Sequence, residues 1–352
     1  MKVNTFFRFL FYFLILLLLI SPACKRSFVD ANNNNDSSLY TQYQLDSLTL
    51  SSLKKVDDYP LYVMTYYGDY GFDDYLKTGR WQTSDIREQH VDKFACTCFA
   101  ALNADGGRLF GRGFDWRNRA SLLLFTNPSN ANSSVSMVDL NYFGYGNNKE
   151  LDSPDIKQTF LRPLLQTPYL PFDGMNEHGL AIGMMAVQHA EPPYDPQKVT
   201  IGEIEIIRLV LDYAKNVDEA VQLIKKYNVR MDNPPIHYLI SDKTGQSIII
   251  EFVNKNMKII RNTGTWQVST NFILSEFDTP EAANCRRYNY AWSYLQENNG
   301  SISHDNAMSI LENVSQTNTM WSMVYNMSNG DIYASVGRQY DNIHKFSLKQ
   351  NK

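Results

Sequence analysis

The sequence predicts a mixed α and β fold built on antiparallel strand pairs. Two patterns point to it: apolar runs joined by Gly-containing turns, which are typical of β-hairpins, and helical periodicity between those runs. Hairpin patterns at residues 95–116, 237–252 and 321–336 are interrupted by helical stretches at 200–227 and 287–314. Strand pairs with helices between them favour separate α and β layers, and they argue against a parallel Rossmann-type sheet. The chain also lacks a Gly-rich phosphate loop.

The first predicted element is a helix over Leu45–Val56, where apolar residues recur at about helical spacing. An aromatic-rich stretch, Tyr59–Trp81, follows and is broken by three glycines. At 95–116 an apolar run, an Asp-Gly turn and a second run predict a strand pair. Strand alternation places Cys96 and Cys98 on one face of the first strand, and the threonine between them on the other.

Capping signals predict two helices in the middle of the chain. Thr200 and Glu203 have the spacing of a capping box, which predicts a helix that ends near Ala214. Asn216 and Glu219 predict a second helix in the same way, ending near residue 227. The apolar patterns that follow predict strands, helices and a last hairpin at 237–242, 246–252, Met257–Ile260, Trp266–Ser269, Arg287–Glu297, His304–Val314 and 321–336.

The composition excludes several classes of protein. The 352 residues are 43% hydrophobic and carry a formal net charge of −4, which excludes a wholly disordered chain. A charge this close to neutral gives no electrostatic argument for nucleic acid as a partner. With 18 Gly, 13 Pro and 4 Cys, the chain is neither collagen-like nor a disulfide scaffold. Its length suits one large domain or two small ones.

The N-terminus has the pattern of an export signal. Lys2 and Arg8 form a short basic region before Phe9–Ile20, an apolar run of twelve residues. A helix that spans a bilayer needs about 20 apolar residues, so this run is too short. Cys24 follows a small residue and resembles a bacterial lipoprotein processing site, which predicts a signal over 1–23, export, and a lipid anchor on Cys24 at a bacterial membrane. The alternative is ordinary signal cleavage with an incidental cysteine.

The predicted domain layout starts with that signal and a flexible tether over 24–44, which contains four consecutive asparagines. A segment over 45–95 then packs on a catalytic domain over 96–352, and it is a candidate propeptide or separate fragment. Beyond Cys24 the cysteines number three, Cys96, Cys98 and Cys285. An odd number in an exported chain cannot all pair internally, so we expect at least one free thiol.

A Cys-Thr pair at Cys96 and a Gly-Arg-x-x-Asp run that ends at Asp115 resemble the opening of the N-terminal-nucleophile linear amide hydrolases. That family includes bile salt hydrolases, penicillin V acylase, acid ceramidase and relatives of isopenicillin N acyltransferase. Its arginine follows the nucleophile by sixteen residues. Arg112 stands sixteen residues after Cys96 and fourteen after Cys98, so the resemblance selects Cys96 as the nucleophile.

Three later stretches resemble the same family in the same order: an Asn-Glu-x-Gly-Leu run at 176–180, Thr-Asn ending at Asn271, and Arg-aromatic at Arg287. Arg286 competes with Arg287 for the last role. The closing strands, 321–325 and 340–342, also resemble those of the family, so the resemblance covers about residue 94 to the end.

The sequence departs from the family pattern at two places. Gly113 stands where an asparagine is usual, so one hydrogen-bonding side chain is missing. Ala186 stands where bile salt hydrolases and penicillin V acylases carry an asparagine or tyrosine that helps the oxyanion hole. These departures argue against bile salt and penicillin V specificity more than against hydrolysis itself.

The resemblance implies an α+β fold of four layers, αββα, in which two antiparallel sheets lie face to face with helices outside. It implies cleavage between Ala95 and Cys96, after which the α-amine of Cys96 serves as the base. Arg112 would stabilise the thiolate and Asp115 would orient the amine. Oxyanion donation would come from Asn271, and Arg287 would be a further catalytic residue. The implied substrate is a small N-acyl amide, with no cofactor and no metal.

Other readings of the same residues remain open. Acyl transfer to an amine would use the same acyl-enzyme. A papain-like pairing of Cys96 with His237 has a suitable sequence separation, but a papain-like cysteine opens a helix. A zinc site is disfavoured because Cys96 and Cys98 lack a second ligand pair at metal spacing. A non-catalytic surface lipoprotein that binds a ligand is the main alternative to an enzyme, and homo-oligomerisation stays open.

Overall fold

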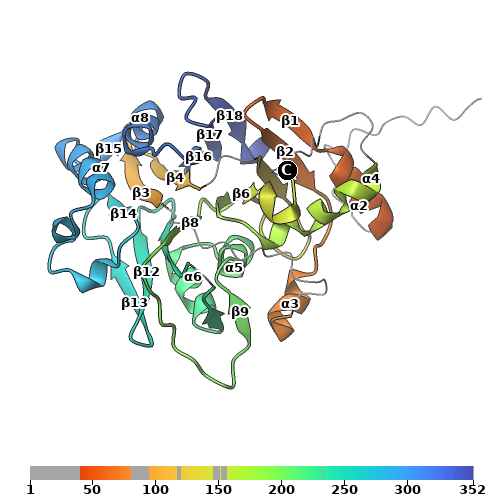
Figure 1. Ribbon diagram of the computed structural model, residues 1–352, viewed down its shortest axis with the longest axis horizontal. Helices are drawn as coiled ribbons and strands as arrows, with labels where there is room; N and C mark the ends of the chain where they lie inside the picture. Colours follow the sequence, from red (N-terminus) through yellow and green to blue (C-terminus); the bar gives the residue numbers. More distant parts are fainter. Residues whose placement is uncertain are drawn as a thin grey trace, which may run out of the picture. The chain divides into compact units, whose positions relative to one another are not determined.

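The computed structural model describes residues 40–80, 95–116, 120–145, 151, 157–232 and 234–351. The chain divides into two units, Met1–Asp36 and Ser37–Lys352, and every described residue belongs to the second. Two large sheets of that unit lie face to face, and helices cover their outer faces (Figure 1). This arrangement confirms the predicted four-layer α+β fold.

The sheet that carries Cys96 has seven strands among the described residues, in the order β14-β3-β4-β16-β17-β18 with β15 beside β3. The hairpins predicted at 95–116 and 321–336 are both present in it, as β3–β4 and β16–β17. The turn of the first hairpin places Gly106 at a positive φ, a conformation that glycine adopts without steric cost. Its strands are β3 (Ala95–Asn103), β4 (Arg108–Asp115), β14 (Gln267–Ser269), β15 (Ser301–Ile302), β16 (Thr319–Asn326), β17 (Asp331–Val336) and β18 (His344–Ser347).

The facing sheet has nine strands among the described residues, in the order β1-β2-β5-β6-β7-β8-β11-β12-β13. It differs from the predicted antiparallel sheet at one place, because β2 pairs with β5 in parallel. Between these two strands the chain runs through β3 and β4 of the other sheet, so no hairpin constrains their direction. The strands are β1 (Lys54–Asp57), β2 (Leu61–Tyr66), β5 (Ser121–Thr126), β6 (Ser134–Asp139), β7 (Asp173–Asn176), β8 (Ala181–Ala186), β11 (Ile236–Ser241), β12 (Ser247–Val253) and β13 (Asn256–Arg261).

Helices of the described part of the chain form the outer layers. α7 (Arg286–Glu297) and α8 (His304–Val314) pack on β3, β4 and β14, whereas α5 (Glu205–Tyr213) and α6 (Val217–Ile224) belong to the layer on the nine-stranded sheet (Figure 1). The predicted cap at Asn216 is present, since its side chain accepts from the backbone N–H of Glu219 at 2.9 Å. Both C-terminal helices lie where the apolar periodicity predicts them.

The helix predicted from Thr200 begins later, which corrects the capping-box interpretation. Thr200–Gly202 forms a short strand, β9, that pairs in parallel with β10 (Asn228–Arg230). α5 starts at Glu205 without a side-chain cap. The pairing with β10 uses the backbone groups that a helix would need, so a contact distant in sequence overrides the local signal.

The helix predicted over Leu45–Val56 is also shorter than expected. α2 (Gln42–Ser51) is capped at Thr41 and ends before Ser52, and β1 begins at Lys54 and pairs with β2. The other helical elements are α3 (Phe72–Thr78), α4 (Gln158–Leu161), and the 3-10 helices η2 (Leu140–Phe143), η3 (Arg162–Tyr169), η4 (Leu274–Glu276), η5 (Pro280–Ala283) and η6 (Leu348–Asn351).

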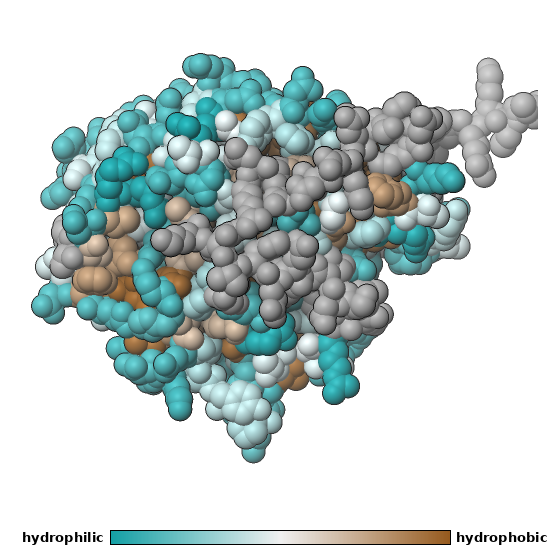
Figure 2. Space-filling view, viewed as in Figure 1, coloured by the Kyte–Doolittle hydropathy of each residue, from teal (hydrophilic) through white to brown (hydrophobic). Residues whose placement is uncertain are grey.

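The core lies between the sheets and under the helices, and the surface is mostly hydrophilic. Figure 2 shows the hydrophilic surface of one face, with hydrophobic residues gathered on the side where Figure 1 draws α7, β12 and β13. Partly exposed apolar residues of β13 and α7, among them Met257, Ile259 and Trp292, account for apolar surface on these elements. Among the helices that the structure describes, none has the length and apolarity to cross a membrane.

Candidate active site

Cys96 lies at the second position of β3, in the space between the two sheets, with 1% of its surface exposed. The pairing of β3 with β4 sets Cys96 opposite Phe114 and Cys98 opposite Arg112. Gly183 of β8 faces this point from the other sheet, and a Cβ there would stand 2.8 Å from the Sγ of Cys98. The missing side chain therefore lets the sheets approach closely enough to bury both thiols.

Arg112 is fully buried beside the two thiols. Its Nη1 donates to the carbonyl oxygen of Gly113 at 2.7 Å, and its Nε lies 3.4 Å from a carboxylate oxygen of Asp173. Nη2 has no hydrogen-bond partner among the described residues. Burial disfavours the charge, but Cys96, Cys98 and Asp173 outweigh it and raise the pKa of Arg112. The site therefore holds a permanent positive charge next to the two thiols.

Asp173 is a member of this site that lies outside the predicted catalytic residues. It lies on β7, is fully buried, and accepts hydrogen bonds from Trp321 Nε1 at 2.9 Å and from the hydroxyl of Tyr325 at 2.5 Å. Burial raises its pKa, and the charge of Arg112 opposes that rise. A single acidic residue directly after an apolar stretch, Leu170–Phe172, is the signal that could have indicated this buried partner.

Asp115 lies at the end of β4, opposite Ala95, the first residue of β3. Its carboxylate accepts a hydrogen bond from the hydroxyl of Thr319. Burial raises the pKa of Asp115 to about 6, although the hydrogen bond from Thr319 and the charge of Arg287 both lower it. Asp115 therefore stands next to the peptide bond at which cleavage is expected, with a carboxyl that changes charge in the mildly acidic range.

Asn271 and Arg287 enclose the backbone of Cys96. The backbone N–H of Cys96 donates to Oδ1 of Asn271 at 2.5 Å. Arg287, in the first turn of α7, donates to the same oxygen from Nη2 at 2.9 Å, and from Nη1 to the carbonyl oxygen of Cys96 and to Thr97. Arg286 is exposed and bonds to a carbonyl oxygen of α8 instead. Of these two candidates, the structure places Arg287 at the site.

The geometry at Asn271 differs from the expected one in one respect. The oxygen of its side chain faces Cys96, while Nδ2 donates to the backbone carbonyl of Ala186 at 2.7 Å. An amide nitrogen has two N–H groups, so one remains for an oxyanion while the other holds Ala186. Gly113 also departs from the family pattern without affecting the thiol side, because a side chain there would point at Leu311 of α8.

The three thiols beyond the N-terminus are free, and their surroundings differ. Burial raises the pKa of Cys98 to about 12, although Arg112 opposes the rise, so Cys98 stays protonated at neutral pH. Cys285 is half-buried at the start of α7, with its sulfur 3.3 Å from the hydroxyl of Thr270. Cys24 lies outside the described residues.

The papain-like alternative is not formed. Nε2 of His237 lies 2.7 Å from the carbonyl oxygen of Thr270, which can only accept, so the proton of Nε2 is committed to that bond. Nδ1 faces Glu251 at 3.5 Å. Cys96 also lies within a strand rather than at the start of a helix. His237 is therefore a neighbour of the Asn271 loop and not a partner of the thiol.

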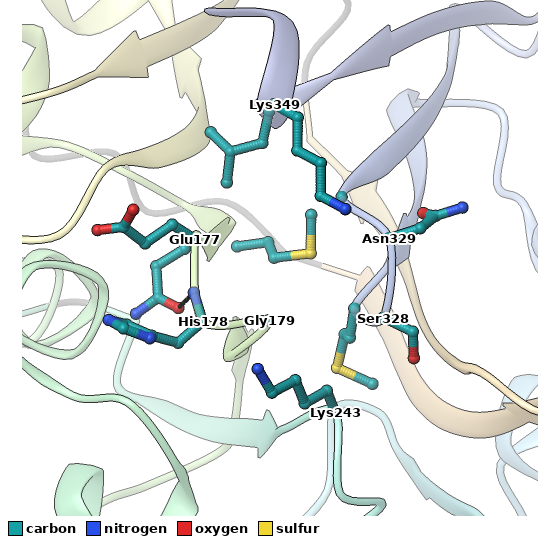
Figure 3. A pocket seen from close by; sticks show the side chains of 12 residues that line it. Glu177, His178, Gly179, Lys243, Ser328, Asn329 and Lys349 are labelled. Atoms are coloured by element: carbon teal, nitrogen blue, oxygen red, sulfur yellow. Dashed lines mark hydrogen bonds between the residues drawn. The ribbon is translucent and has the colours of Figure 1, made fainter. Parts of the chain in front are cut away.

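A separate pocket of about 80 Å³ lies at the turn end of the sheets. Figure 3 shows Lys243 and Lys349 pointing toward it from opposite sides, with Glu177 and Ser328 on its other walls. Ser328 bonds to Arg108, at the opposite end of the β3–β4 pair from Cys96. None of the five predicted catalytic residues lines this pocket, so it is distinct from the thiol site.

Solved structures with known activities share this fold. A variant of the conjugated bile acid hydrolase from Clostridium perfringens superposes with a TM-score of 0.53 at 15% identity, over 72% of this chain and 93% of that chain. The penicillin V acylase from Agrobacterium tumefaciens superposes with a TM-score of 0.50 at 19% identity, over 72% and 86% of the two chains. The four layers are those of the N-terminal-nucleophile hydrolases.

The family follows from the sequence model that matches residues 96–289, which describes the linear amide C–N hydrolases of the choloylglycine hydrolase family. The chain belongs to this family. An uncharacterized protein of Paramecium bursaria Chlorella virus 1 is 34% identical over 88 residues, 22% of this chain. The match spans about a third of that relative's length (32%).

Proposed function

We propose that this protein hydrolyses the amide bond of a small N-acyl substrate, with Cys96 as an N-terminal nucleophile that forms a thioester. The observation that carries the proposal is the enclosure of Cys96: Asn271 and Arg287 bind its backbone, and the charge of Arg112 acts on its thiol. An amide is a poor electrophile, so the reaction needs an activated thiolate and a stabilised oxyanion.

The first half of the proposed reaction forms the acyl-enzyme. The α-amine of Cys96, freed by cleavage after Ala95, takes the thiol proton, and the sulfur attacks the carbonyl carbon of the amide. The electron pair of the carbonyl moves to oxygen, where the second N–H of Asn271 Nδ2 can donate. As the tetrahedral species collapses, the C–N bond breaks and the amine leaves with the proton from the α-ammonium group.

The second half regenerates the thiol. Water attacks the thioester and gives one proton to the α-amine. The C–S bond breaks, a carboxylic acid leaves, and the α-ammonium group returns its proton to the sulfur. An amine in place of water would give acyl transfer through the same intermediate. Hydrolysis is favoured by family membership, since the matching model describes hydrolases.

An electrophilic N-acyl amide probe tests the assignment of the nucleophile. We expect peptide mapping to find the acyl group on Cys96, because burial holds Cys98 in its unreactive protonated form. Cys98→Ser is the matched control, because residue 98 lies two positions further along β3 on the same face. Its Cys96 should be labelled to the same extent as in the wild type. A label that stays on Cys98 in Cys96→Ser would contradict the assignment.

We also propose that the protein is exported and anchored to a bacterial membrane through a lipid on Cys24. The basic start, the twelve apolar residues and the small residues before Cys24 support it. In a bacterial expression host we expect the wild type in the membrane fraction and Cys24→Ser in the soluble exported fraction. Equal distribution of the two proteins between the fractions would argue for an incidental cysteine.

A further inference from the structure

A buried pair of titratable side chains lies behind the proposed site and has no part in the chemistry described so far. His237 of β11 and Glu251 of β12 are each 1% exposed, and their Nδ1 and Oε1 atoms are 3.5 Å apart. Burying such groups costs free energy unless they are paired and hydrogen-bonded. Their partners therefore indicate what the pair does.

Both side chains bind one loop, at its two ends. His237 donates from Nε2 to the carbonyl oxygen of Thr270 at 2.7 Å. Glu251 accepts from the backbone N–H groups of Leu274 at 2.6 Å and Ser275 at 3.1 Å. Burial works against the charge of Glu251, but His237 and Ser275 outweigh it and lower the pKa of that carboxyl. The loop over 270–275 is thus held by an ionised carboxylate and an imidazole.

Asn271 is the second residue of this loop, directly after the residue that His237 binds. Its Oδ1 meets the backbone nitrogen of Cys96, and its backbone carbonyl accepts from Gln188 at 2.9 Å. A shift of the loop would move Asn271 along with it, away from Cys96. Displacements of about 1 Å in a catalytic group can cost about 100-fold in rate.

We propose that His237 and Glu251 are positioning residues, which fix the 270–275 loop so that Asn271 stays in register with Cys96. This inference rests on the function proposed for Cys96. It assigns neither residue a contact with the substrate, so their loss should act on the rate of the chemical step more than on substrate binding.

The test compares His237→Leu with His237→Gln. Each variant is expressed as the whole chain and assayed after cleavage between Ala95 and Cys96. Leucine removes the donor to Thr270, and we expect kcat to fall by about 10- to 100-fold with KM changed by less than about 3-fold. Glutamine can donate from its amide to the same carbonyl, so it should recover most of kcat. Ser241→Ala, at the far end of the same strand, is the matched control and should have the kcat of the wild type.

Wild-type kcat in folded His237→Leu would overturn the inference, and so would an equal loss of kcat in the glutamine and leucine variants. If His237→Leu does not fold, Glu251→Gln replaces it. Leu274 and Ser275 donate to different oxygens of Glu251, and glutamine puts an NH2 donor at one of these two positions. Wild-type kcat in that variant would equally overturn the inference. Labelling of Cys96 by the N-acyl probe separates the two hypotheses. A wild type that is never labelled contradicts the proposed function, whereas equal labelling of wild type and His237→Leu contradicts only the positioning role.

Discussion

Cys96→Ala is expected to remain a single chain and to hydrolyse no amide, while the wild type appears as two fragments that divide between Ala95 and Cys96. The thiol is the expected nucleophile for both reactions, first on the peptide bond before it and later on the substrate. Denaturing electrophoresis and intact mass of each purified protein report the cleavage, and hydrolysis of a panel of N-acyl amides reports the activity.

The control for this experiment is Cys98→Ala, which removes the other buried thiol on the same strand face. It should be cleaved and active, because burial raises the pKa of Cys98 and keeps its sulfur protonated. Full activity from uncleaved wild-type protein would rule out the N-terminal-nucleophile mechanism, since the base in that mechanism is an amine that only cleavage produces.

Asp115→Asn is expected to cut turnover by about 10²- to 10⁴-fold and to leave the fold at least as stable as in the wild type. The ionised carboxylate stands beside the future α-amine and would hold it in place. In the wild type, turnover should fall as the pH drops through about 6, where this carboxyl takes up a proton. The residual activity of the variant should lack that acidic limb.

The stability of the same variant follows from the sign of the pKa shift. Burial raises the pKa of Asp115 above that of the unfolded chain, so the folded protein binds more protons between about pH 4 and 6 and loses stability as the pH rises. The asparagine variant does not lose stability in this way as the pH rises. In the wild type, each unit by which the pKa is raised lowers the free energy of unfolding at high pH by about 1.4 kcal/mol. Thermal melting at pH 5 and pH 8 checks it. Wild-type turnover with normal melting would mean that Asp115 is structural.

Arg112→Gln does not test the catalytic role of Arg112 by itself, because the substitution also affects folding. The resemblance implies that Arg112 stabilises the thiolate, but Arg112 is also paired with Asp173, and both side chains are fully buried. Removal of one partner leaves a buried carboxyl without its counter-charge, which typically costs about 3–5 kcal/mol. Loss of activity in that variant would therefore mix a catalytic effect with a folding effect.

The parts of the site that the sequence predicts are those tied to local spacing. A two-stranded hairpin converts the distance along the chain into a register, so Cys96, Arg112 and Asp115 can be related by counting. Asn271 and Arg287 are predicted only from the resemblance. They follow Cys96 by 175 and 191 positions in the chain, and no local pattern indicates that they meet its backbone.

The contacts that the sequence does not predict are those between the sheets and across distant strands. The pairing of Asp173 with Arg112 depends on which strands of the two sheets face each other, and single-chain patterns do not specify that. The helix start expected at Thr200 is wrong for the same reason. Residues 200–202 pair with β10, a strand distant in sequence, instead of forming the first turn of a helix. Hairpins and isolated helices, which depend on neighbours in the chain, are predicted well.

The parallel pairing of β2 with β5 concerns the assembly of the protein as well as its topology. β2 precedes the expected cut and β5 follows it, and they share a register of six residue pairs, from Leu61 with Ser121 to Tyr66 with Thr126. Nearby, the hydroxyl of Tyr70 donates to Asp212 at 2.6 Å. A chain cut after Ala95 is thus a heterodimer joined by a shared sheet. Before the cut, folding is unimolecular. After the cut, the two fragments must reassociate following full unfolding, and this second-order process slows with dilution. The lifetime of the cut protein therefore depends on slow unfolding and not on its ability to refold.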